Sequence, residues 1–305
     1  MRREQIMNKR LLNCFASDFL QMSPTELKSA IRASEGRTLL SENIATRFPV
    51  GHDITNSEVA RAFGADLILL NKLDLFNPEI AGLTSSERTP IAQLKHLVGR
   101  PIGVNLEPVD TAAKMAEERV IISSGRQATR ETLCKANEMG FDFICLTGNP
   151  GAGVSNHAII ESIAVAKECY HGLIIAGKMH GAGVDEEVVN LAVINAFIDQ
   201  GADIILLPAV GTVPGISMAM IAEAVKVIRQ RGALSLSAIG TSQESADVST
   251  IRDIVLMNKI AGVDIQHIGD AGYCGMAPYL NILEASRVLR GDRHTIHMIA
   301  ASVNR

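Results

Sequence analysis

The stretch GLIIAGKMHGAG, residues 172–183, holds the pattern that decides the fold. It opens with a short apolar run between glycines, residues 173–176, which is typical of a strand buried on both faces. Lys178 and His180 follow two residues apart, so an extended strand places both side chains on one side. A Gly-Ala-Gly turn comes next, and Asp185 is suited to cap a following helix. The stretch therefore predicts one strand–helix unit with polar groups at the carboxyl end of its strand.

The same unit recurs along the chain. We predict strands at 37–42, 66–72, 101–107, 142–148, 173–180, 203–209, 233–241 and 264–270. Helical patterns fill the gaps, at 56–64, 90–98, 129–139, 156–170, 185–200, 215–231, 247–261 and 276–290. Strands that alternate with helices predict a parallel sheet, and eight such strands close a barrel.

A finer regularity supports the barrel. The second, fourth, sixth and eighth strands all begin Gly-x-Asp, at Gly64-Ala65-Asp66, Gly140-Phe141-Asp142, Gly201-Ala202-Asp203 and Gly262-Val263-Asp264. A two-strand unit repeated four times favours a (β/α)8 TIM barrel over an open, doubly wound sheet. The aspartates fall at the amino ends of the strands, the face that serves stability in such barrels. We expect them to lie together, opposite Lys178.

The chain divides into an N-terminal helical extension (1–36), the barrel (37–291) and a C-terminal tail (292–305). Two helices are predicted in the extension, one at 7–22 and one from a capping box at Ser23-Pro24-Thr25-Glu26 to about Ser34. The extension is expected to pack against the barrel floor or a partner subunit, and we expect a homo-oligomer. The sequence leaves open whether the tail covers the barrel or reaches a neighbour.

Composition excludes several classes of function. The net charge is −4, and no basic run is interleaved with aromatic residues, which argues against nucleic acid as a partner. No apolar run approaches the ~20 residues that span a bilayer, so we expect no membrane association. Five scattered cysteines without a C-x-x-C motif predict reduced thiols in a cytoplasmic protein.

Barrel enzymes work at the carboxyl ends of the strands, which predicts four catalytic residues. Lys178 is expected among Asn105, Glu107 and Asp270, as a Schiff base or an electrophile, or else as a structural partner of a carboxylate such as Glu107. Glu107 is the favoured general base. His180 is an acid/base, a metal ligand or a solvated loop residue. Asp270 pairs with a lysine or binds a divalent cation.

Further residues at the same ends predict substrate contacts. Polar side chains come from Glu42, Asn71, Asn105 and Asn149, and a phosphate cradle is expected from Gly240, Thr241, Ser242 and Gly272 after the last two strands. The negative charge of Asp270 disfavours an anion there unless its side chain faces elsewhere. No motif with zinc spacing occurs, so no metal ligand is assigned and no cofactor is required, although a divalent cation such as Mg²⁺ stays open.

The chain resembles a family of uncharacterised bacterial (β/α)8 proteins often encoded near sugar-uptake systems. The resemblance spans nearly the whole chain and is carried by ASEGRT (33–38), GVNLEP (103–108), FICLTGNPG (143–151), AGKMH (176–180), AIGTSQ (238–243) and HIGDAG (267–272). It implies the barrel, and two labels used in the family imply a haloacid-dehalogenase-like hydrolase or a phosphonomutase-like enzyme. The sequence lacks the Asp-x-Asp motif that the first label implies, since its first strand ends Ser41-Glu42-Asn43. The second fits a barrel, but its acidic metal-binding signature is not found.

These observations predict a cytoplasmic barrel enzyme that acts on a small phosphorylated, sugar-derived or keto-acid substrate. The reaction is expected to be aldolase or lyase chemistry, or isomerisation, with Lys178 and Glu107 in the leading roles. One alternative is a metal-assisted hydrolase or phosphonomutase-like enzyme that uses Glu107, His180 and Asp270. Another is a non-catalytic barrel that binds a sugar phosphate.

Overall fold

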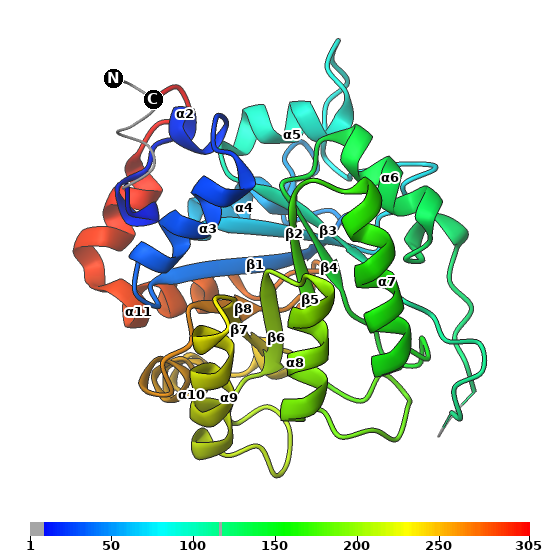
Figure 1. The fold of residues 1–305 in the computed structure, drawn as a ribbon. Helices are drawn as coiled ribbons and strands as arrows, with labels where there is room; N and C mark the ends of the chain where they lie inside the picture. The colour runs from blue at the N-terminus through cyan, green and yellow to red at the C-terminus, as the bar shows by residue number, and fades with distance from the viewer. Residues whose placement is uncertain (1–8, 116–117) are drawn as a thin grey trace.

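The computed structural model describes residues 9–115 and 118–305. Eight parallel strands close into a barrel in sequence order (Figure 1). They are β1 (Thr38–Ile44), β2 (Leu67–Asn71), β3 (Ile102–Leu106), β4 (Phe143–Leu146), β5 (Leu173–Gly177), β6 (Ile204–Pro208), β7 (Leu234–Ile239) and β8 (Ile265–Ile268). The predicted TIM barrel is confirmed, and each strand lies within two or three residues of its predicted bounds.

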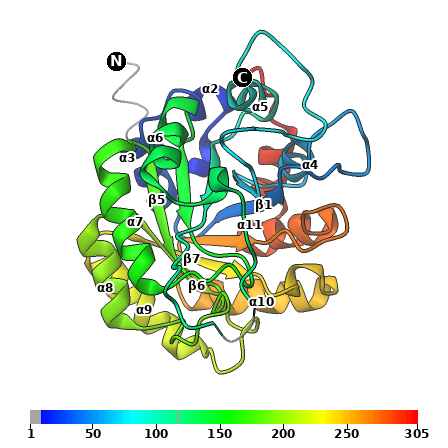
Figure 2. The same ribbon diagram turned by 90° about the vertical axis from the view of Figure 1, so that its right-hand side faces the viewer.

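Helices surround the strands, as the view along the barrel shows (Figure 2). They are α4 (Asn56–Ala62), α5 (Pro90–Val98), α6 (Arg130–Met139), α7 (Asn156–Cys169), α8 (Leu191–Gln200), α9 (Met218–Gln230), α10 (Val248–Ile260) and α11 (Tyr279–Ala300). In the described parts of the chain, no helix is both long and apolar enough to cross a membrane.

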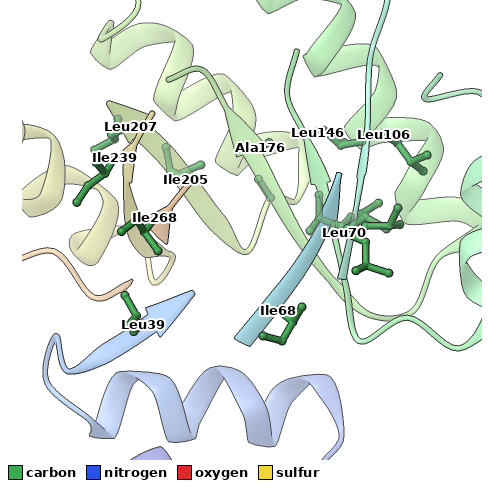
Figure 3. Close-up of a cluster of buried hydrophobic side chains, with 14 of the residues drawn as sticks. Leu39, Ile68, Leu70, Leu106, Leu146, Ala176, Ile205, Leu207, Ile239 and Ile268 are labelled. Carbon is green, nitrogen blue, oxygen red and sulfur yellow. The ribbon is translucent and has the colours of Figure 1, made fainter. Parts of the chain in front are cut away.

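Alternate residues of each strand face two different cores. The outer core lies between strands and helices, where Leu39, Ile68, Leu70, Leu106, Leu146, Ala176, Ile205, Leu207, Ile239 and Ile268 pack together (Figure 3). The residues between them fill the barrel itself, among them Leu40, Leu69, Phe143, Ile175, Leu206 and Leu236. The lower half of the barrel is therefore a packed core, and open space is left only towards the carboxyl ends of the strands.

The N-terminal segment closes the barrel floor. Leu11, Phe19, Leu27 and Ile31 belong to the same buried cluster as the inner strand residues. A 3-10 helix (Leu11–Asn13), α2 (Ala16–Phe19) and α3 (Pro24–Ala33) carry these side chains. The capping box at the start of α3 is confirmed.

The single helix predicted at 7–22 is wrong for the described residues 9–22. The backbone is extended at Cys14 and Phe15, between the two short helices. Asp18 explains this break, because its carboxylate accepts the Phe15 N–H at 2.8 Å. This hydrogen bond caps a new helix that starts directly after Phe15. Residues 7 and 8 of this prediction lie outside the described residues.

The C-terminal segment returns to the same floor. Helix α11 continues to Ala300 across a kink at Gly291, whose φ of +69° suits glycine. The Met298 carbonyl accepts a hydrogen bond from Arg100 at 2.8 Å, and the Arg305 carbonyl accepts one from the Ser17 N–H at 2.7 Å. The C-terminus accordingly lies beside α2 (Figure 1).

The Gly-x-Asp aspartates tie neighbouring strands together at the amino ends. Each carboxylate accepts a backbone N–H near the start of the preceding strand: Asp66 from Leu39 (2.9 Å), Asp142 from Ile102 (2.8 Å), Asp203 from Ile174 (3.2 Å) and Asp264 from Ser235 (2.9 Å). Each also has a cation within 4 Å, respectively Arg290, Lys95, Lys28 and Arg229. The structural role that the sequence predicted for these aspartates, at the amino ends of the strands, is confirmed.

Candidate active site

A cavity of about 820 Å³ opens at the carboxyl ends of the strands. Nine residues predicted for the site line it: Glu42, Asn71, Asn105, Asn149, His180, Gly240, Thr241, Ser242 and Asp270. They come from loops and strand ends all around the barrel, which is why residues far apart in sequence meet there. The structure shows that these nine residues share one cavity, whereas their roles in binding or catalysis stay predictions.

An amide network crosses the cavity. Asn71 and Asn149 exchange hydrogen bonds between their side chains, at 2.9 and 3.1 Å. The Asn71 amide also donates to Asp270 at 2.8 Å, and the Asn105 side chain lies 3.2 Å from Asn71 Oδ1. Asn71 thus fixes the loops after β4 and β8 relative to each other and orients the Asp270 carboxyl.

Asp270 faces the cavity and has an unusual titration. Burial raises the pKa of its carboxyl to about 7, and the nearby Glu42 carboxylate adds to the rise, while the Asn71 hydrogen bond and Lys72 oppose it. At neutral pH the carboxyl is therefore divided between its acid and base forms. This is the protonation behaviour that a group needs for transferring protons.

Glu244 is a cavity residue that the sequence analysis did not identify. It lies in a short 3-10 turn after β7 and is only 2% exposed. Its Oε1 accepts the Ala271 N–H at 3.0 Å, whereas its buried Oε2 has no partner. Burial raises the pKa of this carboxyl as well. Its place after the seventh strand was the only signal that the sequence offered.

The third carboxylate, Glu42, is paired with a histidine. The two side chains lie inside the barrel, with His267 Nε2 3.0 Å from Glu42 Oε2, and both are buried. His267 lies on β8. This histidine faces the barrel interior and holds a carboxylate that lines the cavity.

His180 contributes a neutral imidazole. Its Nδ1 accepts the Ala182 N–H at 2.9 Å, so the ring proton resides on Nε2. Burial lowers the pKa of the ring, although Glu42 acts in the opposite direction. A neutral histidine with Nε2–H in the cavity is a hydrogen-bond donor for a carbonyl or oxyanion.

Lys178 does not lie where we expected it. Strand β5 ends at Gly177, and Lys178 keeps the outward side of Ile174 and Ala176, so its side chain leaves the barrel interior. Its ammonium donates to Glu186 at 2.5 Å, and its side chain is 1% exposed. The predicted position among Asn105, Glu107 and Asp270 is wrong. Because the strand stops before Lys178, Lys178 and His180 do not share a face.

The Lys178–Glu186 pair holds the loop between β5 and α8. Glu186 Oε2 also accepts the Asn156 N–H at 2.9 Å, which joins this loop to the start of α7. Lys178→Met should lower the free energy of unfolding by about 1–3 kcal/mol, since it leaves a half-buried carboxylate without its cation and with the Asn156 N–H as its remaining donor. Urea unfolding measures this change. A variant as stable as the wild type would show that the pair contributes nothing.

Glu107 and Gly272 also lie outside the cavity lining. Glu107 is 1% exposed, and its two oxygens accept from Arg126 (2.6 Å) and the Asn149 N–H (2.8 Å). The expected open carboxylate is therefore wrong, because Glu107 anchors the loop after β4. A side chain at Gly272 would meet the Met276 carbonyl at 1.8 Å, so this glycine serves a tight turn.

Strained backbone is concentrated around the cavity. Among the described residues, five that are not glycine have positive φ, and four of them line the cavity: Lys72, Ala182, Thr241 and Ser242. Such conformations cost of order 1–3 kcal/mol each and persist where the surrounding structure enforces them. Lys72, Thr241 and Ser242 are exposed and so form the rim. Nowhere in the described residues do three or more His, Cys, Asp or Glu side chains group so that they hold a metal ion.

The chain belongs to the family described as Domain of unknown function (DUF7916), which matches residues 12–305. The expected uncharacterised family is thereby confirmed, whereas its gene neighbourhood and labels stay predictions. Among curated proteins, none matches this sequence.

Solved structures share the fold at low identity. A 2,3-dimethylmalate lyase, a member of the PEP mutase/isocitrate lyase superfamily, is similar with a TM-score of 0.52 and 13% identity over 83% of this chain and 81% of that one. The carboxyl transferase domain of Rhizobium etli pyruvate carboxylase, solved with pyruvate and biocytin, has a TM-score of 0.57 and 15% identity. That match covers 93% of this chain but 49% of the other, so this chain spans about half of its length. At such identities the likeness is one of fold.

Proposed function

We propose that this protein is an enzyme of the lyase or isomerase type that moves a proton next to a carbonyl group. The observation that carries the proposal is Asp270, a cavity carboxyl whose pKa of about 7 lets it take up and release a proton at neutral pH. The fold shared with a 2,3-dimethylmalate lyase is consistent with this class of reaction.

The cavity supplies the groups that such a step needs. The Asp270 carboxylate removes a proton from carbon beside the carbonyl, and the C–H electron pair forms an enolate whose oxygen receives a hydrogen bond from His180 Nε2–H. Return of the proton to the former carbonyl carbon, together with transfer of the neighbouring hydroxyl proton to the enolate oxygen, gives an isomer. Alternatively, Asp270 takes a hydroxyl proton, and the breaking C–C bond supplies the electrons of the enolate. We assign Asn71 and Asn149, which line the cavity, to contacts with hydroxyl groups of the substrate.

The rim is suited to an anionic end of the substrate. Lys72 supplies a cation there, and the Thr241–Ser242 turn presents backbone and hydroxyl groups on the lining of the same cavity. Deeper in the cavity an anion would meet Glu42, Glu244 and Asp270. A phosphate or carboxylate group therefore belongs at the rim, and we propose a small hydroxylated carbonyl compound with such a group.

Hydrogen exchange at carbon tests the proposal before the full reaction is known. The test panel consists of pyruvate, 2-oxobutyrate, dihydroxyacetone phosphate and fructose 6-phosphate in D₂O. We expect the protein to exchange the carbon-bound hydrogens of at least one of these compounds, and ¹H NMR measures the exchange. Boiled protein serves as the control. If panel members raise the melting temperature but none exchanges, the protein is instead a barrel that only binds these compounds.

A further inference from the structure

We propose that the substrate carries a protonated amine, which binds deep in the cavity between the carboxylates of Glu42, Glu244 and Asp270. The proposal rests on the proposed function for the location of the site, and it names the substrate class. The arrangement of these three side chains, and the groups that contact them, supports this class.

The three carboxylates lie on neighbouring parts of the barrel. Strands β7, β8 and β1 are adjacent, and the side chains come from β1 itself and from the loops after β7 and β8. They are close enough to repel one another, since Glu42 and Glu244 both raise the pKa of Asp270. A ligand that brings positive charge relieves this repulsion.

The protein itself supplies little positive charge to the cluster. Asp270 accepts from an amide, Glu244 from a backbone N–H, and Glu42 from His267. In the parts of the chain that the structure describes, no lysine or arginine forms an ion pair with any of the three. Lys72 lines the cavity as well, but its side chain is exposed at the rim.

Glu244 is the observation that points to a ligand rather than to a merely acidic surface. Its Oε2 is buried without a hydrogen-bond partner, in a residue that lines the cavity. A buried carboxylate oxygen of this kind is costly unless a donor reaches it. An ammonium group has three N–H donors and a single positive charge, so it can serve oxygens of several carboxylates at once.

Matched ligands test this inference by isothermal titration calorimetry. The pairs are glucosamine 6-phosphate with glucose 6-phosphate, and serinol with glycerol, which differ in an amine in place of a hydroxyl. At neutral pH at least one amine should bind about tenfold or more tightly than its partner, as expected for a charge-assisted hydrogen bond. Binding should also release protons, because the charge of the amine favours the ionised forms of Asp270 and Glu244, whose pKa values burial raises against the opposing effects of Lys72 and His267.

Two variants make the test specific. Glu244→Gln keeps the shape of the side chain but removes its charge, and it should abolish the preference for the amine; Asp270→Asn gives an independent second measurement. Glu187→Gln, an exposed carboxylate bonded to Asn190 outside the cavity lining, is the matched control and should keep the preference.

Several results would overturn the inference. One is that no amine binds more tightly than its hydroxyl partner, and another is that the preference survives both cavity variants. Saturable binding of Mg²⁺ or Mn²⁺ alone, lost in Glu244→Gln, would assign the cluster to a metal instead. Each of these outcomes leaves hydrogen exchange on keto compounds intact, so failure of this inference is distinct from failure of the proposed function.

Discussion

Asp270→Asn will reduce hydrogen exchange at carbon at least ~100-fold, the usual loss when a general base is removed. Asparagine keeps the size of the side chain and its contact with Asn71, but it cannot accept a proton. In the wild type the exchange rate should rise with pH through about 7 and then level off, because the base form of Asp270 is populated above its pKa. ¹H NMR over a series of pH values measures both effects.

The matched control is Asp253→Asn, the same change at an exposed position on α10. It should leave the rate and the pH profile unchanged. Exchange that persists in Asp270→Asn with the wild-type pH profile would show that another group is the base.

Asp270 lowers the stability of the folded protein at the same pH values at which its carboxylate form promotes exchange. The pKa of Asp270 is raised in the folded protein, so its contribution to stability is complete below the ordinary aspartate range and is lost as pH rises through about 7. At pH values above 7, Asp270→Asn should therefore unfold at a higher urea concentration than the wild type. A less stable variant there would contradict the unfavourable charge that we assign to this site.

Arg290→Met will lower the free energy of unfolding by about 3–5 kcal/mol, the cost of leaving one partner of a buried ion pair alone. The side chains of Arg290 and Asp66 are both 0% exposed, and Arg290 Nη1 lies 2.7 and 2.6 Å from the two oxygens of Asp66. Arg290 also donates to the Gly64 carbonyl and to Ser286. The pair joins α11 to the residue that precedes β2. Urea unfolding measures the free energy that is lost with it.

Arg287→Met is the control on the same helix. Its pair with Asp292 is half exposed on both sides, and its more distant partner Glu284 (3.6 Å) keeps Arg252 at 2.8 Å, so the loss should be within about 1 kcal/mol. Adding Asp66→Asn to Arg290→Met should recover part of the stability, because the asparagine oxygen still accepts the Leu39 N–H without a buried charge. Equal losses in Arg290→Met and Arg287→Met would refute the role of burial.

The sequence predicted the fold well because its signals are periodic and local. Alternating apolar runs and amphipathic helices gave the strand order, and the recurrent Gly-x-Asp gave the fourfold repeat with its role at the amino ends. The helix at 7–22 was mispredicted, since apolar spacing does not reveal that Asp18 caps a new helix at Phe15. Barrel topology also explains why residues that follow the strands gathered in one cavity.

The site was predicted less well because side-chain direction depends on where each strand ends. Lys178 was placed in the cavity although it continues the outward side of Ile174 and Ala176, and β5 ends before His180, so the two side chains do not share a face. Glu107 was assigned as a base because nothing in the sequence links it to Arg126, 19 residues further on. Glu244 lies in an irregular turn, where no periodicity indicates which way a side chain points.

The closed floor has a consequence for the traffic of small molecules. Leu11, Leu27 and Ile31 seal the barrel from below, so among the described residues the cavity opens on the side of the rim formed by Lys72, Thr241 and Ser242. In the proposed reaction, substrate and product would share this opening. In a cleavage that yields two fragments, the fragment nearer the rim has to depart first, and the deeper one waits behind it. In the proposed cleavage, release is thus ordered, and the deeper product, which leaves last, competes directly with substrate for the empty cavity.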